Sequence, residues 1–417
     1  MSASPFTAKA ALRVIAASRP EAAADPGVNW RGGLLLKKNL DPKPILANVL
    51  HALRHAPALV GLLAWDEFRL RVTIERPTPW GSQPGPWLER DDISATEWMQ
   101  KEYIDVRPDV VGQAVQRIAL EQPRHVVRDY LTSLQWDGVP RVGRWLTRYL
   151  GVEESLIAGA FGQCWLISAV ARIMKPGAKV DTCLILEGKQ GIGKSRALKI
   201  LAGEFFTDSI PDLHSKDAAV QLAGVWIVEL AELDSLGRAE SATIKAFMSR
   251  QTDRFRPPYG KRAEDAPRQC VFAGSVNESE YLKDATGARR FFPVKCGDVF
   301  DLAGLESDRD QLWAEALFLF RAGVPWWLED EELVQAAVES QAERFDADPW
   351  EDGIRYFLLG KPSVTLDHIF DVHLNKPRKD VTQRDKIRVA RCLQAIDWER
   401  YKYREGGRIV WAYREKD

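Results

Sequence analysis

The segment TCLILEGKQGIGKSRALKIL (182–201) is the feature that most constrains what this chain can fold into. It contains the spacing G-x-x-x-x-G-K-S between an apolar run and a helical pattern. Glycines in such a loop let backbone N–H groups turn toward phosphate oxygens without an intervening Cβ. The lysine neutralises phosphate charge, the hydroxyl binds Mg²⁺, and the amino end of the following helix favours anions. The segment therefore predicts a site for ATP and Mg²⁺ formed by Gly188, Gly191, Gly193, Lys194 and Ser195.

The surrounding pattern predicts an α/β fold. Helical stretches alternate with short apolar runs that are bounded by glycine, which is typical of a parallel sheet flanked by helices. The expected strands cover Thr182–Leu186, Val225–Leu230, Cys270–Ser275 and Phe291–Val294. The expected helices of this region and its flanks cover 127–134, 142–150, 155–174, 311–322 and 331–345.

In GVWIVELAELD the apolar run Val225–Val228 ends in Glu229, and Glu232 lies three residues further. Nucleotide hydrolysis requires one acid at the end of a buried strand, where it holds the Mg²⁺ shell, and a second carboxylate that orients the attacking water. We assign Glu229, with Ser195, to the metal shell and Glu232 to water activation. Their order stays open, because the usual pair is adjacent and two residues intervene here. Glu232 could instead cap the next helix.

Polar groups also border the later strands. QCVFAGSVN ends in Asn277, whose amide could bind the γ-phosphate or the attacking water. GARRFFPV places Arg289 and Arg290 before an apolar strand. In a ring ATPase this position supplies the arginine finger to the nucleotide of the neighbouring subunit. The alternative for the arginines is a solvated or phosphate-binding surface pair, and which of them is the finger stays open.

A cationic segment, DRFRPPYGKR, lies between the acids and Asn277. Its prolines, tyrosine and glycine predict a tight turn that exposes the basic side chains. Such a hairpin could bind a nucleic-acid backbone, and the alternative is a solvated loop. The basic residues are Arg254, Arg256, Lys261 and Arg262.

Taken together, these segments resemble the virulence-associated protein E family, phage- and prophage-borne ATPases similar to superfamily 3 helicases of the AAA+ class. The resemblance covers roughly residues 123–345 and rests on YLTSLQWDGVPR, LEGKQGIGKS, GVWIVELAELD, DRFRPPYGKR, FAGSVN, YLKDATGARRFFPV and DQLWAEAL. It implies an AAA+ P-loop core, and a helicase or translocase that acts on single-stranded or forked DNA in phage or mobile-element replication. It also implies a homo-hexameric ring that hydrolyses ATP at subunit interfaces, with a separate primase as a possible partner.

Two other functions were weighed against this one. The main alternative is a non-translocating ATPase switch that binds DNA as a replication initiator, loader or regulator. A small-molecule kinase is less favoured, because no acceptor pocket or lid is recognisable. Primase activity is not expected, because the chain lacks zinc-ribbon cysteines and has no D-x-D catalytic cluster before residue 120.

The C-terminal segment is basic: residues 361–417 contain 14 Lys and Arg against nine Asp and Glu. A helix is expected over Thr382–Ala395, followed by a hairpin in WERYKYREGGRIVWAY. Helices followed by a hairpin suggest a winged-helix-like domain that binds nucleic acid. The phosphate contacts are assigned to Lys379, Arg384 and Arg388, and the alternative is a winged helix that contacts protein.

The expected organisation is a flexible leader (1–34), a small α+β domain (35–120), a helical collar with the P-loop ATPase domain (121–345), and the winged-helix-like domain (346–417). The small domain should contain a helix over 44–55, a hairpin over 60–74, a proline- and glycine-rich loop over 76–92, and a helix from about residue 109.

Charge and cysteine content bear on partners and location. The net charge of -1 argues against a protein that coats nucleic acid with its whole surface, but it allows a local basic patch. Five widely spaced cysteines fit reduced thiols in a cytoplasm, here that of a bacterial host. No signal peptide is recognisable. The longest apolar runs, 56–65 and 159–171, look too short to span a bilayer, so no membrane contact is expected.

Overall fold

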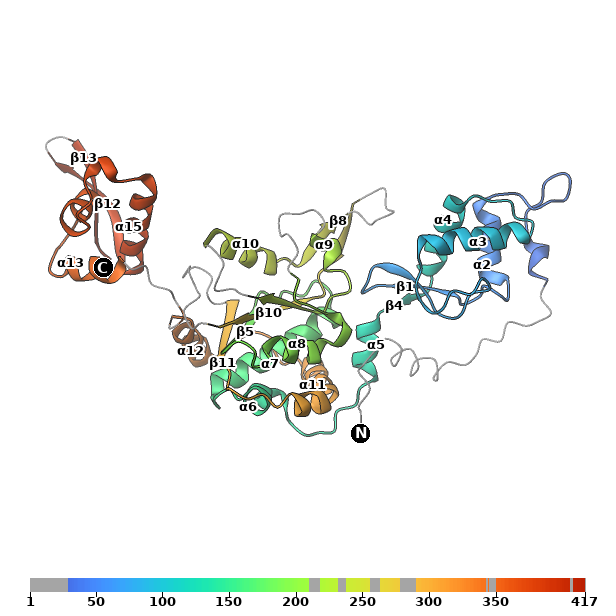
Figure 1. The fold of residues 1–417 in the computed structure, drawn as a ribbon, viewed down its shortest axis with the longest axis horizontal. Coiled ribbons are helices and arrows are strands. Elements are labelled where there is room, and N and C mark those ends of the chain that lie inside the picture. The colour runs from blue at the N-terminus through green and yellow to red at the C-terminus, as the bar shows by residue number, and fades with distance from the viewer. Residues whose placement is uncertain are drawn as a thin grey trace. The chain divides into compact units, whose positions relative to one another are not determined.

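The computed structural model describes residues 29–209, 218–231, 238–255, 263–277, 290–342, 344, 350–405 and 408–416. The chain divides into two compact units, residues 1–344 and 345–417. The first unit is built on a five-stranded sheet whose strands run parallel (Figure 1). In spatial order these strands are β11 (Phe291–Lys295), β5 (Cys183–Glu187), β10 (Val271–Val276), β7 (Ile227–Ala231) and β6 (Phe206–Thr207).

The four strands predicted from apolar runs are confirmed, and β6 was not predicted. β10 lies between β5 and β7, because Gly274 pairs with Ile185 on one side and with Leu230 on the other. Since all these strands are parallel, their carboxyl ends share one edge of the sheet. The segments that follow β5, β7 and β10 therefore begin next to one another.

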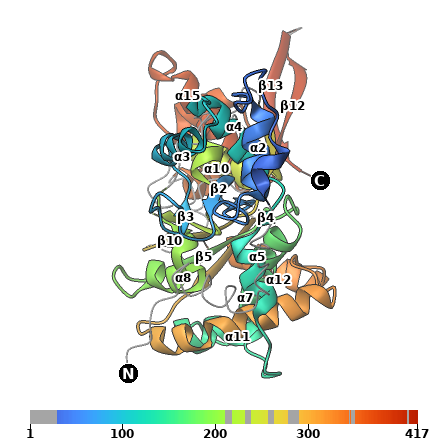
Figure 2. The ribbon, with the colours of Figure 1, turned by 90° about the vertical axis from the view of Figure 1, so that its right-hand side faces the viewer.

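Helices cover both faces of the sheet: α7 (Leu156–Met174) and α11 (Leu302–Arg321) lie on one side and α10 (Arg238–Met248) on the other (Figures 1 and 2). The predicted helices are confirmed, but α11 begins nine residues earlier than expected. The reason is Asp301, whose side chain accepts a hydrogen bond of 2.8 Å from the Gly304 N–H and so caps the helix. The remaining helices of this part are α5 (Val126–Ser133), α6 (Trp145–Leu150), α8 (Lys194–Ala202), α9 (Ala218–Gln221) and α12 (Glu331–Ala342).

Buried tryptophans join these layers. Trp165 donates to the Phe272 carbonyl at 2.8 Å, Trp226 to Ala169 at 3.0 Å, and Trp313 to Leu201 at 3.0 Å. Each indole buries a large apolar surface while its N–H finds a backbone acceptor, so the bond links two elements. The core therefore fixes α7 against β10, and α11 against α8.

The expectation that the apolar run over 159–171 is too short to span a bilayer was wrong. Helix α7 extends it to 19 residues, which is long and apolar enough to cross a membrane by length and composition alone. The run looked shorter because it was counted only to the first charged residue, Arg172, and the helix includes that arginine. Of the most apolar stretch, 72% is buried inside the protein, as in the core helix of a globular fold.

The N-terminal part of the first unit has its own four-stranded sheet, in the order β3 (Gly85–Pro86), β2 (Arg71–Ile74), β1 (Leu63–Asp66) and β4 (Pro123–Arg124). The predicted hairpin is confirmed, with Leu63 opposite Ile74. Its helices are α2 (Leu46–His55), α3 (Glu89–Lys101) and α4 (Pro108–Ala119). The loop expected over 76–92 ends early, because the buried Asp91 carboxylate accepts the Leu88 N–H at 2.9 Å and starts α3.

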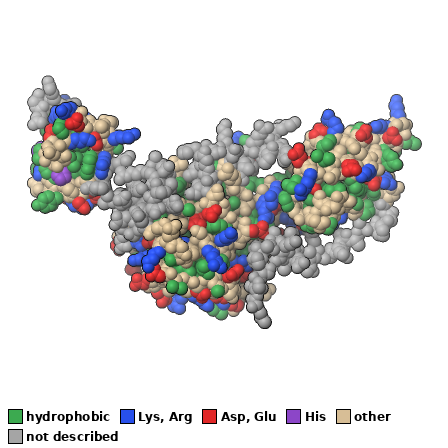
Figure 3. Space-filling view, in the orientation of Figure 1, with side chains coloured by type: hydrophobic (Ala, Val, Ile, Leu, Met, Phe, Trp, Pro, Cys, Tyr) green, Lys and Arg blue, Asp and Glu red, His purple; other side chains and the backbone are tan. Residues whose placement is uncertain are grey.

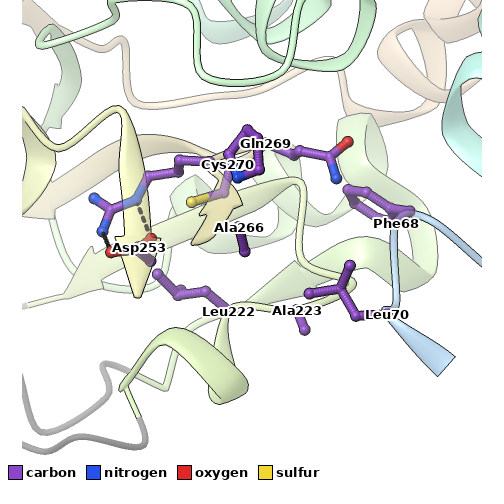
Figure 4. Close-up of a pocket in the computed structure, with 10 residues that line it drawn as sticks. Phe68, Leu70, Leu222, Ala223, Asp253, Ala266, Gln269 and Cys270 are labelled. Carbon is purple, nitrogen blue, oxygen red and sulfur yellow. Dashed lines mark hydrogen bonds and ion pairs between the residues drawn. The ribbon is translucent and has the colours of Figure 1, made fainter. Parts of the chain in front are cut away.

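The turn between β1 and β2 contacts the central sheet region. Phe68 accepts the Gly224 N–H at 2.9 Å, and Arg69 forms an ion pair of 2.9 Å with Glu204. Gln269 donates to the Glu67 carbonyl at 3.2 Å. A cavity of about 30 Å³ lies at this seam, and Phe68 and Leu70 line it together with residues that flank β7 and β10 (Figure 4). The N-terminal part is therefore bound to the core through the hairpin turn.

The second unit contains α13 (Glu351–Leu358), α14 (Leu366–His368), α15 (Gln383–Ala395) and a hairpin of β12 (Trp398–Glu405) and β13 (Arg408–Glu415). Two short helical turns, Ile369–His373 and Arg378–Asp380, lie between α14 and α15. The predicted helix and hairpin are confirmed. Thr382 and Asp385 form a reciprocal cap that begins α15, and Val389, Leu393 and Trp398 pack in the core.

Candidate functional site

The loop after β5 turns sharply before α8 begins at Lys194. Gly188 has φ +151° and Gly193 has φ +105°, values that favour glycine. A Cβ on Gly188 would lie 2.8 Å from Ile192 Cδ1, so a larger residue would collide within the loop. Gly191 is exposed between them. The loop thus leads directly into the amino end of a nine-residue helix, where backbone N–H groups are available to an anion.

Lys194 is buried, with 7% of its surface exposed. Its Nζ donates to the carbonyls of Gly188 at 2.5 Å and Lys189 at 2.9 Å, and to Asn277 Oδ1 at 3.2 Å. The loop lysine and the residue after β10 therefore meet, as their places on adjacent parallel strands require. Two loop carbonyls and the amide oxygen of Asn277 therefore hold the ammonium group of Lys194 against the loop.

Glu229 lies in β7 and is fully buried. Ser195 donates its hydroxyl to Glu229 Oε1 at 2.8 Å, which joins the start of α8 to the acid strand. Glu229 Oε2 is buried and has no hydrogen-bond partner among the described residues. A buried carboxylate oxygen without a partner is costly, and Mg²⁺ prefers oxygen ligands of this kind. The donor set of Ser195 and Glu229 therefore fits Mg²⁺.

The other predicted residues of the first unit are either outside the described residues or lie away from this cluster. Glu232, Arg289, Arg256, Lys261 and Arg262 lie outside the described residues. Arg290 comes one residue before Phe291, which pairs with Cys183 at the amino end of β5. The loop begins at the other end of β5, about 20 Å away along the strand direction. Arg290 therefore lies at the opposite edge of the sheet from Lys194 of the same chain.

Arg254 is exposed on the hairpin of β8 (Thr252–Phe255) and β9 (Glu264–Pro267). At the base of this hairpin is Arg268, which the sequence reasoning missed. Arg268 forms a bidentate ion pair with Asp253, at 2.7 Å and 2.5 Å (Figure 4). It also donates to the Phe247 carbonyl at the end of α10. Its side chain is 1% exposed. The only signal in the sequence is an arginine just before an apolar strand.

A second missed ion pair lies next to the loop. Glu187, the last residue of β5, forms a bidentate pair with Arg344 at 2.8 Å and 3.1 Å. Glu187 is buried, and Arg344 is the last residue of the first unit. The ion pair therefore links the last residue of the first unit to the end of β5, immediately before Gly188.

In the second unit, Lys379 and Arg384 are exposed. Arg388 is half-buried, and its guanidinium lies 3.9 Å from the centroid of the Trp350 ring. This contact is a cation–π interaction within the unit. Lys379 and Arg384 thus present charge to solvent, whereas Arg388 also packs against an aromatic ring.

Comparison with known proteins identifies the family. Residues 131–346, just over half of the chain, match the Virulence-associated protein E-like domain. The chain belongs to this family. The family resemblance inferred from the motifs is thereby confirmed. No curated protein matches the chain.

Two solved structures match the chain at low sequence identity. "The A form apo structure of NrS-1 C terminal region-CTR" has a TM-score of 0.43 at 13% identity, over 84% of this chain and 95% of that one. "The apo structure of NrS-1 C terminal region (305-718)" has a TM-score of 0.41 at 13% identity, over the same shares of the two chains.

We expect Glu229→Gln and Ser195→Ala to change stability in opposite directions when Mg²⁺ is absent. Glu229→Gln removes the charge of a buried carboxylate whose Oε2 has no partner among the described residues. It should raise the thermal midpoint, by about 1–2 °C for each kcal/mol in a unit that spans residues 1–344. Ser195→Ala removes the only hydrogen-bond partner that Glu229 Oε1 has among the described residues, and it should lower the midpoint. Thermal denaturation with and without Mg²⁺ measures both. A lower midpoint for Glu229→Gln in metal-free buffer would contradict the assignment.

We expect Arg268→Ala to destabilise the first unit by about 3–5 kcal/mol, because it leaves the Asp253 carboxylate buried without its partner. Arg254→Ala is the matched control, since that arginine is 76% exposed and its ion pair is long, at 3.9 Å. It should change stability by less than about 1 kcal/mol. Urea unfolding of the two variants tests the difference, and equal effects would refute it.

Proposed function

We propose that this protein is an ATP-dependent helicase or translocase that acts on DNA in phage or mobile-element replication. One observation carries the proposal: three neighbouring strands bring Lys194 and Ser195, at the start of α8, into hydrogen bonds with Asn277 and Glu229 respectively. Membership of the virulence-associated protein E-like family supports a role in phage replication.

The cluster fits the needs of phosphoryl transfer. The loop and the amino end of α8 would bind the phosphates of ATP through backbone N–H groups. Lys194 would exchange its loop carbonyls for phosphate oxygens, which are better acceptors for an ammonium group. Ser195 and Glu229 would hold Mg²⁺, which neutralises charge on the phosphates when bound. Asn277 contacts the lysine and would therefore be within reach of the γ-phosphate or the attacking water.

Water activation is assigned to Glu232, three residues after Glu229. Arg289 or Arg290 would stabilise the charge that develops in the transition state. The place of Arg290 at the far edge of the sheet supports an arginine that reaches the nucleotide of a neighbouring chain. A ring of identical subunits, most simply a hexamer, provides such a neighbour at every site.

DNA would be moved by the β8–β9 hairpin, whose basic residues are Arg254, Arg256, Lys261 and Arg262. The Asp253–Arg268 pair supports this role, because it joins the hairpin base to the end of α10 and to the segment before β10. A shift at Asn277 would be passed along β10 toward Arg268. The second unit would add a winged-helix-like contact through Lys379, Arg384 and Arg388, within a bacterial cytoplasm and alongside a separate primase.

Removal of the loop lysine tests the nucleotide site. Lys194→Ala should lower ATP turnover by about 100-fold or more, because it removes a charge that stabilises the transition state. Lys199→Ala is the control, since Lys199 is exposed on the same helix. It should retain turnover near that of the wild type. Steady-state hydrolysis of ATP measures both, and normal turnover in Lys194→Ala would disprove the site.

Strand displacement on forked DNA separates the motor from the ATPase switch. The wild-type chain should unwind the fork with ATP and Mg²⁺, and Lys194→Ala should not, because translocation requires hydrolysis. Hydrolysis that is stimulated by single strands without any unwinding would favour the switch. The assay is read as product strand released per unit time, with a non-hydrolysable ATP analogue as the control.

A further inference from the structure

The C-terminal hairpin has two chemically different faces. β12 and β13 pair in antiparallel register, with Lys402 opposite Trp411, Arg404 opposite Ile409 and Arg400 opposite Tyr413 (Figure 2). Side chains directly opposite each other lie on the same face. One face therefore contains Trp411 with the cations Arg400, Lys402 and Arg404, and we call it the tryptophan face.

The tryptophan face is buried at its base and exposed beyond it. Trp398 and Tyr413, nearest the helices, are 7% and 4% exposed and belong to the core of the unit. Farther along, Trp411 is 49% exposed, and Arg400, Lys402 and Arg404 are exposed. The base is thus held by the core, while the outer part presents an indole and three cations to solvent.

The cations of the tryptophan face are not neutralised within the described part of the chain. Arg400 contacts the Trp411 ring, with its guanidinium 4.0 Å from the ring centroid, and none of the three cations forms an ion pair with a described residue. On the opposite face, Arg414 pairs with Glu399 at 2.7 Å and lies 5.4 Å from the Tyr401 ring. The same kind of arginine–aromatic contact therefore occurs on both faces, but only one face retains its positive charge.

We propose that the tryptophan face binds single-stranded DNA, with a base stacked on Trp411 and phosphates bound by Arg400, Lys402 and Arg404. Proteins that bind single strands combine aromatic stacking with a positively charged track. Cations at alternate positions of a strand are about 7 Å apart, comparable to adjacent phosphates in an extended single strand. A duplex is a poorer ligand, because its bases are already stacked and hide their faces from an indole.

Charge complementarity favours DNA over a protein partner, because the face has three positive charges and one acid, Glu415, which lies at its base opposite Trp398. That the strand is DNA rests on the proposed function. The site itself does not depend on ATP hydrolysis, since no residue of the cluster around Lys194 takes part in it. Surface charge elsewhere is mixed: Figure 3 shows basic and acidic side chains interspersed over the described surface that faces the viewer.

Binding of a fluorescein-labelled dT oligonucleotide to the full chain, measured by fluorescence anisotropy without nucleotide, tests the proposal. Trp411→Ala should weaken binding by about fivefold or more, since stacking contributes about 1–3 kcal/mol per base. Trp411→Phe should recover part of the loss. A duplex of the same length should bind equally to the wild type and to Trp411→Ala.

The charge contribution is tested by a matched pair. Lys402→Gln should reduce the steepness of the plot of log K against log salt by about 0.7, the value for one phosphate contact on a single strand. Arg414→Gln removes one positive charge from the opposite face of the same hairpin and should leave the slope unchanged. Thermal midpoints of both variants show whether the unit is intact.

Three results would overturn the proposal: no binding of dT by the wild-type chain, affinity of Trp411→Ala within twofold of the wild type, or equal slopes for Lys402→Gln and Arg414→Gln. A protein partner on this face would give the second and third of these. The proposed function is tested separately, by ATP turnover, and it fails if Lys194→Ala retains that turnover. The two tests are independent because the binding assay contains no ATP.

Discussion

The pairing of β10 with both β5 and β7 determines how the candidate site is formed. These three parallel strands end at one edge of the sheet, so Glu229 within β7 and Asn277 after β10 both lie near the loop that follows β5. Lys194 reaches Asn277, and Ser195 reaches Glu229, only because of this order. Insertion of another strand at either place would move the acid or the amide by about 5 Å, beyond hydrogen-bond distance.

Buried arginines connect this edge to the rest of the first unit. Arg268 holds the β8–β9 hairpin to α10, and Arg344 holds the chain after α12 to the end of β5. A third, Arg172 near the end of α7, donates to the carbonyls of Val180 and Arg268. Burial lowers the pKa of Arg172 to about 10, so it remains charged at neutral pH.

The elements that were predicted correctly depend on local signals. Apolar runs bounded by glycine became β5, β7, β10 and β11, because a strand buried on both faces needs an unbroken apolar sequence. The errors occurred where a polar side chain accepts a hydrogen bond from the backbone three residues away. Asp91 begins α3 inside a segment rich in proline and glycine, and Asp301 begins α11 before its apolar pattern appears. Both caps depend on how a side chain meets the backbone, which spacing alone does not indicate.

The sequence by itself determined the family, the phosphate-loop pattern and the strands, because these depend on residue types at fixed short separations. Only the tertiary structure decided that Glu229 keeps one buried oxygen unpaired, that Arg290 lies at the far edge from Lys194, and that Arg268 and Arg344 anchor the surroundings of the site. The same is true of the hairpin, whose register places three unneutralised cations on the face of Trp411. These properties depend on which strands are neighbours and how they are aligned, and long-range packing sets both.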